Sequence, residues 1–210
     1  FLLTGMMFKI HKFLILYNSV FFYFYHLLKI LLIPYLKIEK IVPKKGLIID
    51  LGCSYGLLTN ILAFFNKNRK LIGLDYNKSR IKKAYVGLKN TKYKAQDISK
   101  ASIPKVDCIL LVHVLHHVDS RKKQISIINE CKKKLKKNGK LIISEINMEP
   151  NWKFQISQLA DRVLYPKDKC NYLGKKLLNQ ILRDKGFRIK NSKNDERSIW
   201  SDFILTSVKN

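Results

Sequence analysis

From residue 46 onward, short apolar runs alternate with amphipathic segments, and this alternation limits the chain to very few folds. The runs predicted as strands are 47–51, 70–75, 91–97, 107–113 and 140–146. The segments predicted as helices are 56–65, 77–89, 120–136, 151–164 and 174–186. Strands that alternate with helices form right-handed crossovers and hence a parallel sheet.

The last two predicted strands, 187–191 and 198–208, follow each other without a helix between them. Such close neighbours suit an antiparallel hairpin at one edge of the sheet. The sequence therefore predicts an α/β fold with a Rossmann-like, doubly wound, seven-stranded and mostly parallel sheet. One C-terminal strand is antiparallel, and an apolar helix precedes the sheet. The helix over 120–136 is expected to stop at Gly139 in a left-handed conformation.

The most apolar segment, 13–33, is about as long as a membrane span and ends at Pro34. Polar residues interrupt it, and three interpretations remain open: a transmembrane helix, a helix on the membrane surface, or a cap over the active-site edge. No small-residue cleavage site follows, which disfavours a secretory signal. We expect 1–45 to form an apolar cap or membrane-associated segment and 46–210 to form the α/β domain.

The turn after the first strand, "GCSYG" at 52–56, matches two different motifs. As G-x-S-x-G it could be the nucleophile elbow of a serine hydrolase, with Asp107 and a following histidine as partners of Ser54. That elbow normally follows several strands, and Asp107 begins a strand, at the end opposite to where such sites form. The other interpretation is a glycine-rich turn that lets the backbone approach a cofactor.

The cofactor interpretation requires acidic side chains at the carboxyl ends of the following strands, and the sequence supplies them. Asp75 ends the second predicted strand, where it would accept the hydroxyls of a ribose. Asp97 follows the third strand and is placed to meet a base. The turn and both aspartates therefore predict one nucleotide-like site at the same edge of the sheet.

In order and spacing, "IIDLGCSYG", "LIGLDYN", "AQDI", "DCILLVHVLHHVD" and "LKKNGKLIISE" resemble the class I S-adenosylmethionine-dependent methyltransferases, over 46 to about 206. The resemblance implies S-adenosyl-L-methionine as cofactor and methyl transfer as the activity. It places the cofactor against Asp50, Gly52, Cys53, Ser54, Gly56, Asp75, Tyr76, Asp97, Ile98 and His113. Ser54 stands where the family has its central glycine, and we expect a modest loss of cofactor affinity from the added hydroxyl.

The histidines of "VHVLHHVD" lie in the segment that flanks the acceptor in this family, and "LHH" resembles small-molecule O- and C-methyltransferases such as those of quinone biosynthesis. We expect either His116 or His117 to act as the base and the other to be structural, because adjacent residues should not face one pocket. No metal site is predicted, since only Asp119 offers a carboxylate at ligand spacing. Glu145 and Asn147 are placed to touch the acceptor.

A lid over 148–166 and the apolar N-terminal segment would roof the acceptor pocket, so the predicted acceptor is a small, apolar or lipid-like molecule. The formal charge of +26 has two interpretations: compositional drift, favoured because the lysines are scattered, or attraction to anions. The second interpretation predicts peripheral contact with an anionic membrane or, less strongly, nucleic acid. The alternatives are an RNA methyltransferase and a catalytically silent, methyltransferase-like binding subunit.

The four cysteines form no C-x-x-C pair, which indicates a cytoplasmic location, with or without membrane association.

Overall fold

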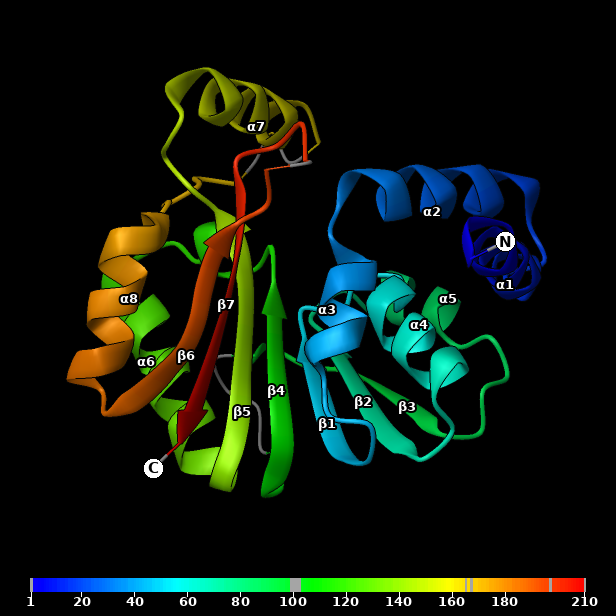
Figure 1. Cartoon of the computed structure of the whole chain (residues 1–210), viewed down its shortest axis with the longest axis horizontal. Helices are drawn as coiled ribbons and strands as arrows, with labels where there is room; N and C mark the ends of the chain where they lie inside the picture. The colour runs from blue at the N-terminus through cyan, green and yellow to red at the C-terminus, as the bar shows by residue number, and fades with distance from the viewer. Residues whose placement is uncertain (1, 99–102, 165, 167, 197, 210) are drawn as a thin grey trace.

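The computed structural model describes residues 2–98, 103–164, 166, 168–196 and 198–209. Seven strands form one sheet in the order β3-β2-β1-β4-β5-β7-β6 (Figure 1). They are β1 (Gly46–Leu51), β2 (Arg69–Asp75), β3 (Thr91–Ala95), β4 (Val106–Val112), β5 (Leu135–Ile146), β6 (Phe187–Asn194) and β7 (Asp202–Lys209). The first five pair in parallel, and β7 runs antiparallel to both β5 and β6. The predicted fold class is confirmed.

Helices cover both faces of this sheet. They are α1 (Leu2–Ile15), α2 (Val20–Leu32), α3 (Tyr35–Ile41), α4 (Leu57–Phe65), α5 (Lys78–Ala84), α6 (Arg121–Lys134), α7 (Asn151–Leu164) and α8 (Gly174–Asp184). Because successive side chains of a strand point to opposite faces, Ile48 packs in the core with α3 and α4, and Ile49 in the core with α6 and α8.

The prediction of a single apolar helix over 13–33 is wrong, because this segment falls into two helices. The chain leaves α1 after Ile15 and starts α2 at Val20, because Asn18 takes a left-handed φ of 45°. Ser19 then caps α2, its hydroxyl accepting a hydrogen bond from the Phe22 amide at 3.4 Å. No single described helix has both the length and the apolar composition of a membrane span; α2 and α3 meet that test only jointly, bent by 68°.

Two predicted helix ends are also corrected. Helix α5 stops at Ala84 rather than near 89, before Gly87 turns the chain with a φ of 83°. Helix α6 stops at Lys134, because Leu135 already pairs with Val106 in the sheet. The left-handed residue of that connection is Asn138, with φ 61°, and not Gly139.

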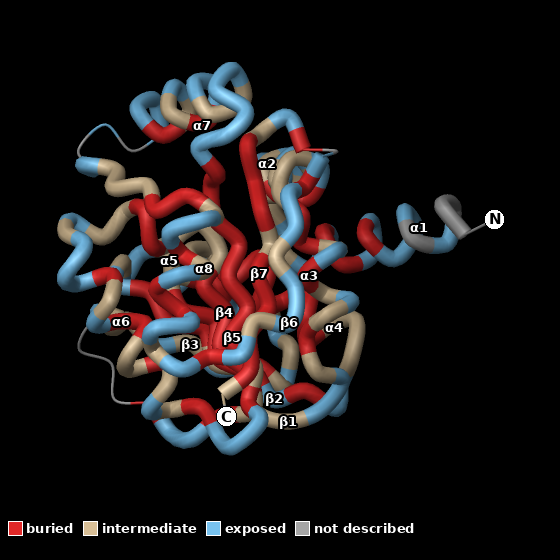
Figure 2. The backbone as a smooth tube through the Cα atoms, turned by 60° about the vertical axis from the view of Figure 1, so that its left-hand side comes forward, coloured by how far each residue is buried: buried red, intermediate tan, exposed pale blue. Residues whose placement is uncertain are grey.

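Helices α2 and α7 lie beyond the edge at which the parallel strands end (Figure 1). The central strands β4, β5 and β7 are largely buried, whereas much of α7 is exposed (Figure 2). Helices α2 and α7 therefore lie over the carboxyl ends of the parallel strands.

Candidate active site

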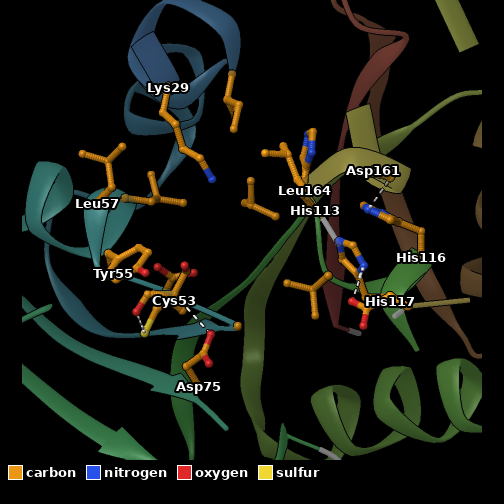
Figure 3. Close-up of a pocket in the computed structure, with 18 of the residues that line it drawn as sticks. Lys29, Cys53, Tyr55, Leu57, Asp75, His113, His116, His117, Asp161 and Leu164 are labelled. Carbon is orange, nitrogen blue, oxygen red and sulfur yellow. Dashed lines mark hydrogen bonds and ion pairs between the residues drawn. The ribbon is translucent and has the colours of Figure 1, made fainter. Parts of the chain in front are cut away.

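One cavity of about 720 Å³ opens at the carboxyl ends of the strands, below α2 and α7 (Figure 3). All of the predicted cofactor-binding residues and both candidate bases line it, except Gly56. They are Asp50, Gly52, Cys53, Ser54, Asp75, Tyr76, Asp97, Ile98, His113, His116 and His117. In Figure 3, Cys53 and Asp75 lie on one side of the cavity and the three histidines on the other. We call these sides the cofactor end and the acceptor end.

The glycine-rich turn at the cofactor end depends on left-handed backbone. Gly52 has φ 76°, and a Cβ there would come within 2.5 Å of a Val114 methyl. Gly56 has φ 72° and caps α4, facing Ala84 and Tyr93, which accounts for its place outside the cavity lining. Ser54 has φ 52°, so the turn keeps a glycine-like backbone although a side chain has been added.

Two buried aspartates lie beside this turn, one bonded to the turn and one to α4. Asp75, which is 4% exposed, accepts hydrogen bonds from the amides of Ser54 and Asn77, each at 2.9 Å. Asp50 accepts a hydrogen bond from the Thr59 hydroxyl at 2.6 Å, and burial raises the pKa of Asp50 to about 6. A carboxylate oxygen can accept more than one hydrogen bond, so Asp75 can still bind hydroxyls from the cavity.

The acceptor end is organised by Glu145, at the end of β5. One carboxylate oxygen accepts the amides of Val114 and Leu115 at 2.9 and 2.6 Å, and the other contacts His116 Nδ1 at 2.5 Å. Burial by itself would raise the pKa of Glu145, but His116 beside it lowers that pKa to about 2. Glu145 is therefore ionised and holds the imidazole of His116 in one orientation.

Helix α7 brings an acidic side chain to the other nitrogen of this imidazole. Asp161 Oδ2 lies 3.6 Å from His116 Nε2 and accepts the Tyr172 hydroxyl at 2.7 Å. The rings of His116 and Tyr172 stack, with an interplanar angle of 14°. His116 is 1% exposed, so its position is set by these neighbours on every side.

The expectation that adjacent histidines cannot face one pocket is wrong. His116 and His117 both line the cavity, because they lie in the short 3₁₀ helix η2 (Leu115–His117), where their ring centroids are 4.2 Å apart. His117 Nδ1 pairs with Asp168 at 3.1 Å, and burial followed by repulsion from His116 keeps the pKa of His117 well below its usual value.

His113, predicted on the cofactor side, pairs through Nε2 with Asp202 at 3.2 Å. Burial would lower the pKa of His113, but Asp202 outweighs it and the pKa is raised. Sequence spacing did not reveal Asp161, Asp168 or Asp202, because they reach the histidines only through the tertiary fold. One available signal was Asp161 itself, an acid one turn after Ser157 on the inward face of the lid helix.

Two further expectations are corrected. Neither Glu145 nor Asn147 is among the residues that line the cavity: Glu145 holds His116, and Asn147 bonds the carbonyl of Glu149 and the amide of Lys175. Asp119 lines the cavity but pairs with Lys123 at 2.6 Å.

The hydrolase alternative has no geometric support. Asp107 lies at the amino end of β4, where it bonds the Leu47 amide at 2.7 Å and Lys136 at 2.9 Å. It is therefore at the opposite end of the sheet from Ser54, as the strand order predicted.

The lining of the cavity is acidic although the chain is strongly basic. Of 15 acidic residues, six line it, against three lysines and arginines. The acids are Asp50, Asp75, Asp97, Asp119, Asp161 and Asp168, and the bases are Lys29, Arg80 and Lys123. Such a lining attracts cations and repels polyanions.

Comparison with known proteins gives a family. A model described as a methyltransferase domain matches residues 28–191. O-methyltransferase 12 of Dictyostelium discoideum is 33% identical over 113 residues, which is 52% of this chain and 30% of that protein. Desmethylxanthohumol 6'-O-methyltransferase of Humulus lupulus is 30% identical over 145 residues, 65% of this chain and 40% of that protein. The match therefore spans less than half the length of these relatives.

Solved structures share the fold at low identity. An O-methyltransferase family 2 protein from Planctomyces limnophilus, in complex with apigenin, superposes with a TM-score of 0.69 at 15% identity, covering 84% of this chain and 57% of that one. Magnesium protoporphyrin IX methyltransferase from Synechocystis PCC 6803, with bound SAH, gives 0.65 at 20% identity, covering 84% and 80%.

Proposed function

This chain belongs to the methyltransferase-domain family, and we propose that it transfers a methyl group from S-adenosylmethionine to a hydroxyl oxygen of a small, apolar acceptor. One observation carries the proposal. A single cavity joins the glycine-rich turn and Asp75 to the histidines that follow β4, so a cofactor and an acceptor can meet inside it. Its volume of about 720 Å³ lies in the range of small-molecule sites.

The residues at the cofactor end fit S-adenosylmethionine, which supplies a methyl group on a positively charged sulfonium. The left-handed backbone of Gly52 and Ser54 keeps the turn open to a ligand, and Asp75 offers a buried carboxylate to ribose hydroxyls. The acidic lining favours a cationic ligand over an anionic one.

Methyl transfer is an in-line displacement, so the protein contributes mainly by orienting the acceptor and excluding water. A hydroxyl acceptor must also lose its proton, and it does so beside His116 and His117, the pair to which the sequence assigns the base. Both curated relatives named above are O-methyltransferases by name, which favours oxygen over carbon as the methylated atom.

The part of the roof that α2 forms is mostly apolar, which supports an apolar acceptor. Helix α2 contributes Tyr25, Leu28 and Leu32 beside Lys29, whereas α7 contributes Leu164 together with the polar Ser157 and Asp161. The lining acids weigh against RNA, the alternative suggested by the net charge, because a polyanion would have to enter an acidic cavity.

We separately propose that helices α1 and α2 contact an anionic membrane. Helices α1 and α2 carry three lysines and no acidic residue, and α2 exposes Phe21, Phe24 and Leu31. Flotation with vesicles containing an anionic lipid tests it. Loss of binding in Phe21→Ser/Phe24→Ser is the expected result, and unchanged binding of that variant refutes the contact.

The function is tested with methyl-labelled S-adenosylmethionine and fractionated cell extracts. We expect the label in an apolar small-molecule or lipid fraction, as a methyl ether or ester. Label in RNA would establish the RNA alternative. Cofactor binding without transfer to any fraction would establish the silent binding subunit.

A further inference from the structure

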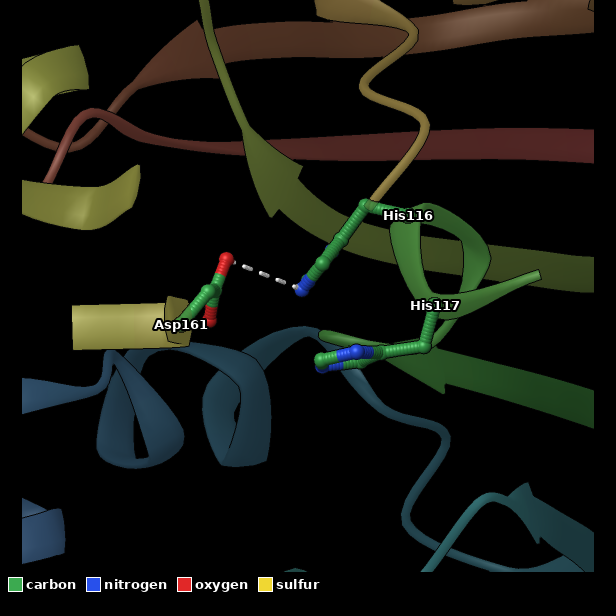
Figure 4. A group of neighbouring side chains, drawn as sticks. All are labelled: His116, His117 and Asp161. Carbon is green, nitrogen blue, oxygen red and sulfur yellow. Dashed lines mark ion pairs between the residues drawn. The ribbon is translucent and has the colours of Figure 1, made fainter. Parts of the chain in front are cut away.

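Three candidate metal-ligand atoms, two from η2 and one from α7, converge at the acceptor end. One atom each from His116, His117 and Asp161 lies within 4.8 Å of the other two, and Figure 4 shows Asp161 of α7 pointing at the η2 histidines. Two imidazoles and a carboxylate are a donor set that zinc and related divalent transition metals take in sites that keep a position open.

The position of His116 Nε2 suits a metal ligand better than a hydrogen-bond donor. Its Nδ1 is engaged by Glu145, which leaves only Nε2 for the cavity. The 3.6 Å from Nε2 to Asp161 Oδ2 is too long for a hydrogen bond, and Nε2 has no hydrogen-bond partner among the described residues. Two ligands each about 2.1 Å from a tetrahedral ion lie about 3.4 Å apart, close to this separation.

A buried nitrogen without a partner carries a free-energy cost, and an ion between these atoms would remove it. His116 is 1% exposed, so water from outside does not readily replace that partner.

Outer contacts already hold the three side chains in the manner of a metal site. A carboxylate behind a ligating histidine fixes its tautomer and raises its basicity, and Glu145 has this relation to His116. Tyr172 donates to Asp161 at 2.7 Å, and Asp168 lies 3.1 Å from His117 Nδ1. The cavity that these residues face is acidic overall, which favours a cation.

We propose that His116, His117 and Asp161 bind one divalent transition-metal ion, with an open position toward the cavity that takes the acceptor oxygen. This inference rests on the proposed function and changes one part of it, because the histidines then act as ligands rather than as the base. The hydroxyl proton leaves to solvent as the oxygen binds the cation. The methyl group then passes to that oxygen, and the sulfonium sulfur keeps the electron pair of the broken S–C bond.

Cobalt(II) is a suitable probe, because tetrahedral Co²⁺ absorbs visible light and needs no acceptor to report binding. The full chain, stripped with a chelator, is titrated with Co²⁺. We expect one equivalent to bind with a tetrahedral spectrum and to be displaced by Zn²⁺. Asp161→Asn and His117→Ala should each weaken binding at least about tenfold, the minimum expected even for loss of an outer contact.

The matched control is His11→Ala, which removes an exposed histidine of α1 that bonds Tyr23 at 2.8 Å. It should bind Co²⁺ like the parent chain. Equal Co²⁺ binding by the parent, Asp161→Asn and His117→Ala overturns the proposed site, as does the lack of any tetrahedral spectrum in the parent.

A thermal shift with S-adenosylhomocysteine on the same samples separates the two proposals and shows that each variant is folded. A cofactor shift without Co²⁺ binding refutes the metal site and leaves the histidines as the base. Co²⁺ binding without a cofactor shift refutes the proposed function and leaves the metal site.

Discussion

The two ends of the cavity are built in different ways. At the cofactor end, Asp50, the glycine-rich turn and Asp75 come from two neighbouring strands, and backbone amides hold the key carboxylate. At the acceptor end, His116 meets Glu145 from β5 and Asp161 from α7, so side chains from separate elements contact one another there. The first end is a local motif, whereas the second exists only when distant elements are packed together.

This difference predicts unequal responses to substitution. A change at the cofactor end should affect mainly ligand binding or the shape of one turn. A change at the acceptor end removes a partner from a buried charged network, and the remaining charges then lose their compensation. Gly52 connects the two ends, because it packs against Val114 in the turn that carries the histidines.

The largest effect is expected for Glu145→Gln at the acceptor end. It removes a buried carboxylate that serves two amides and His116, and the free energy of unfolding at pH 7 should fall by about 3 kcal/mol. Urea denaturation measures this. Glu130→Gln is the control, since the Glu130 side chain of α6 is 45% exposed and pairs with Lys133, so the midpoint of this variant should not move. Equal midpoints for both variants would show that the network does not stabilise the fold.

The connection between the ends is probed by Gly52→Ala against Gly87→Ala. Both glycines have positive φ, 76° and 83°, so each alanine should cost about 1 kcal/mol in backbone strain. Only at Gly52 would the new Cβ meet another side chain, at 2.5 Å, which should lower the free energy of unfolding by about 1 kcal/mol more, the low end for overpacking. Equal losses in chemical denaturation would mean that Val114 moves aside freely and that the two ends are not tightly coupled.

For the cofactor end alone, the test is Asp75→Ala. S-adenosylhomocysteine at a hundred times its Kd should stabilise the parent chain by about 2.7 kcal/mol, and most of that gain should disappear in the variant. Calorimetry or a thermal-shift assay measures it, with the exposed Asp184→Ala as control. If the parent chain shows no shift with the cofactor product, the assignment of this end is wrong.

The smallest expected effect concerns the roof. Burial, followed by repulsion from Lys29, lowers the pKa of His26 to about 3, and neither ring nitrogen has a hydrogen-bond partner among the described residues. In the unfolded chain, His26 takes up a proton near the usual pKa of histidine, whereas in the folded chain it stays neutral down to about pH 3. The free energy of unfolding is therefore unaffected by this group above about pH 6.5 and falls as the pH drops toward 3. At pH 5 the loss should be about 2 kcal/mol.

His26→Phe should remove that loss, and His11→Ala should retain it. Unfolding free energies measured between pH 7 and 4.5 decide the matter. An identical pH dependence in the parent chain and His26→Phe would show that His26 is not buried as a neutral side chain.

Much of the fold could be predicted, because strands and helices leave local periodic patterns. The apolar run of β4 and the amphipathic run of α8 each identified their element without outside information. The prediction failed where a break carries no change in hydropathy. Asn18 interrupts 13–33 although apolar residues continue on both sides, and only its left-handed φ separates α1 from α2.

At the site, sequence reasoning placed the turn, Asp75 and the histidines in one region, since all of them follow strands that end at the same edge. It did not identify the role of Glu145 or the presence of Asp161. Glu145 looked like a side chain that touches the acceptor, but its carboxylate turns inward to the amides of the histidine segment. Nothing in the spacing between His116 and Asp161 predicts that they meet.

The amino-acid order alone determined the class of fold and the position of the glycine-rich turn, because periodicity and turn chemistry depend on residues that are neighbours in the chain. Only the tertiary structure decided which acid faces which histidine. The packing of α7 over the sheet edge brings Asp161 beside His116 Nε2, and the end of β5 brings Glu145 to His116 Nδ1. Such contacts depend on how elements dock in space, which short-range sequence patterns do not encode.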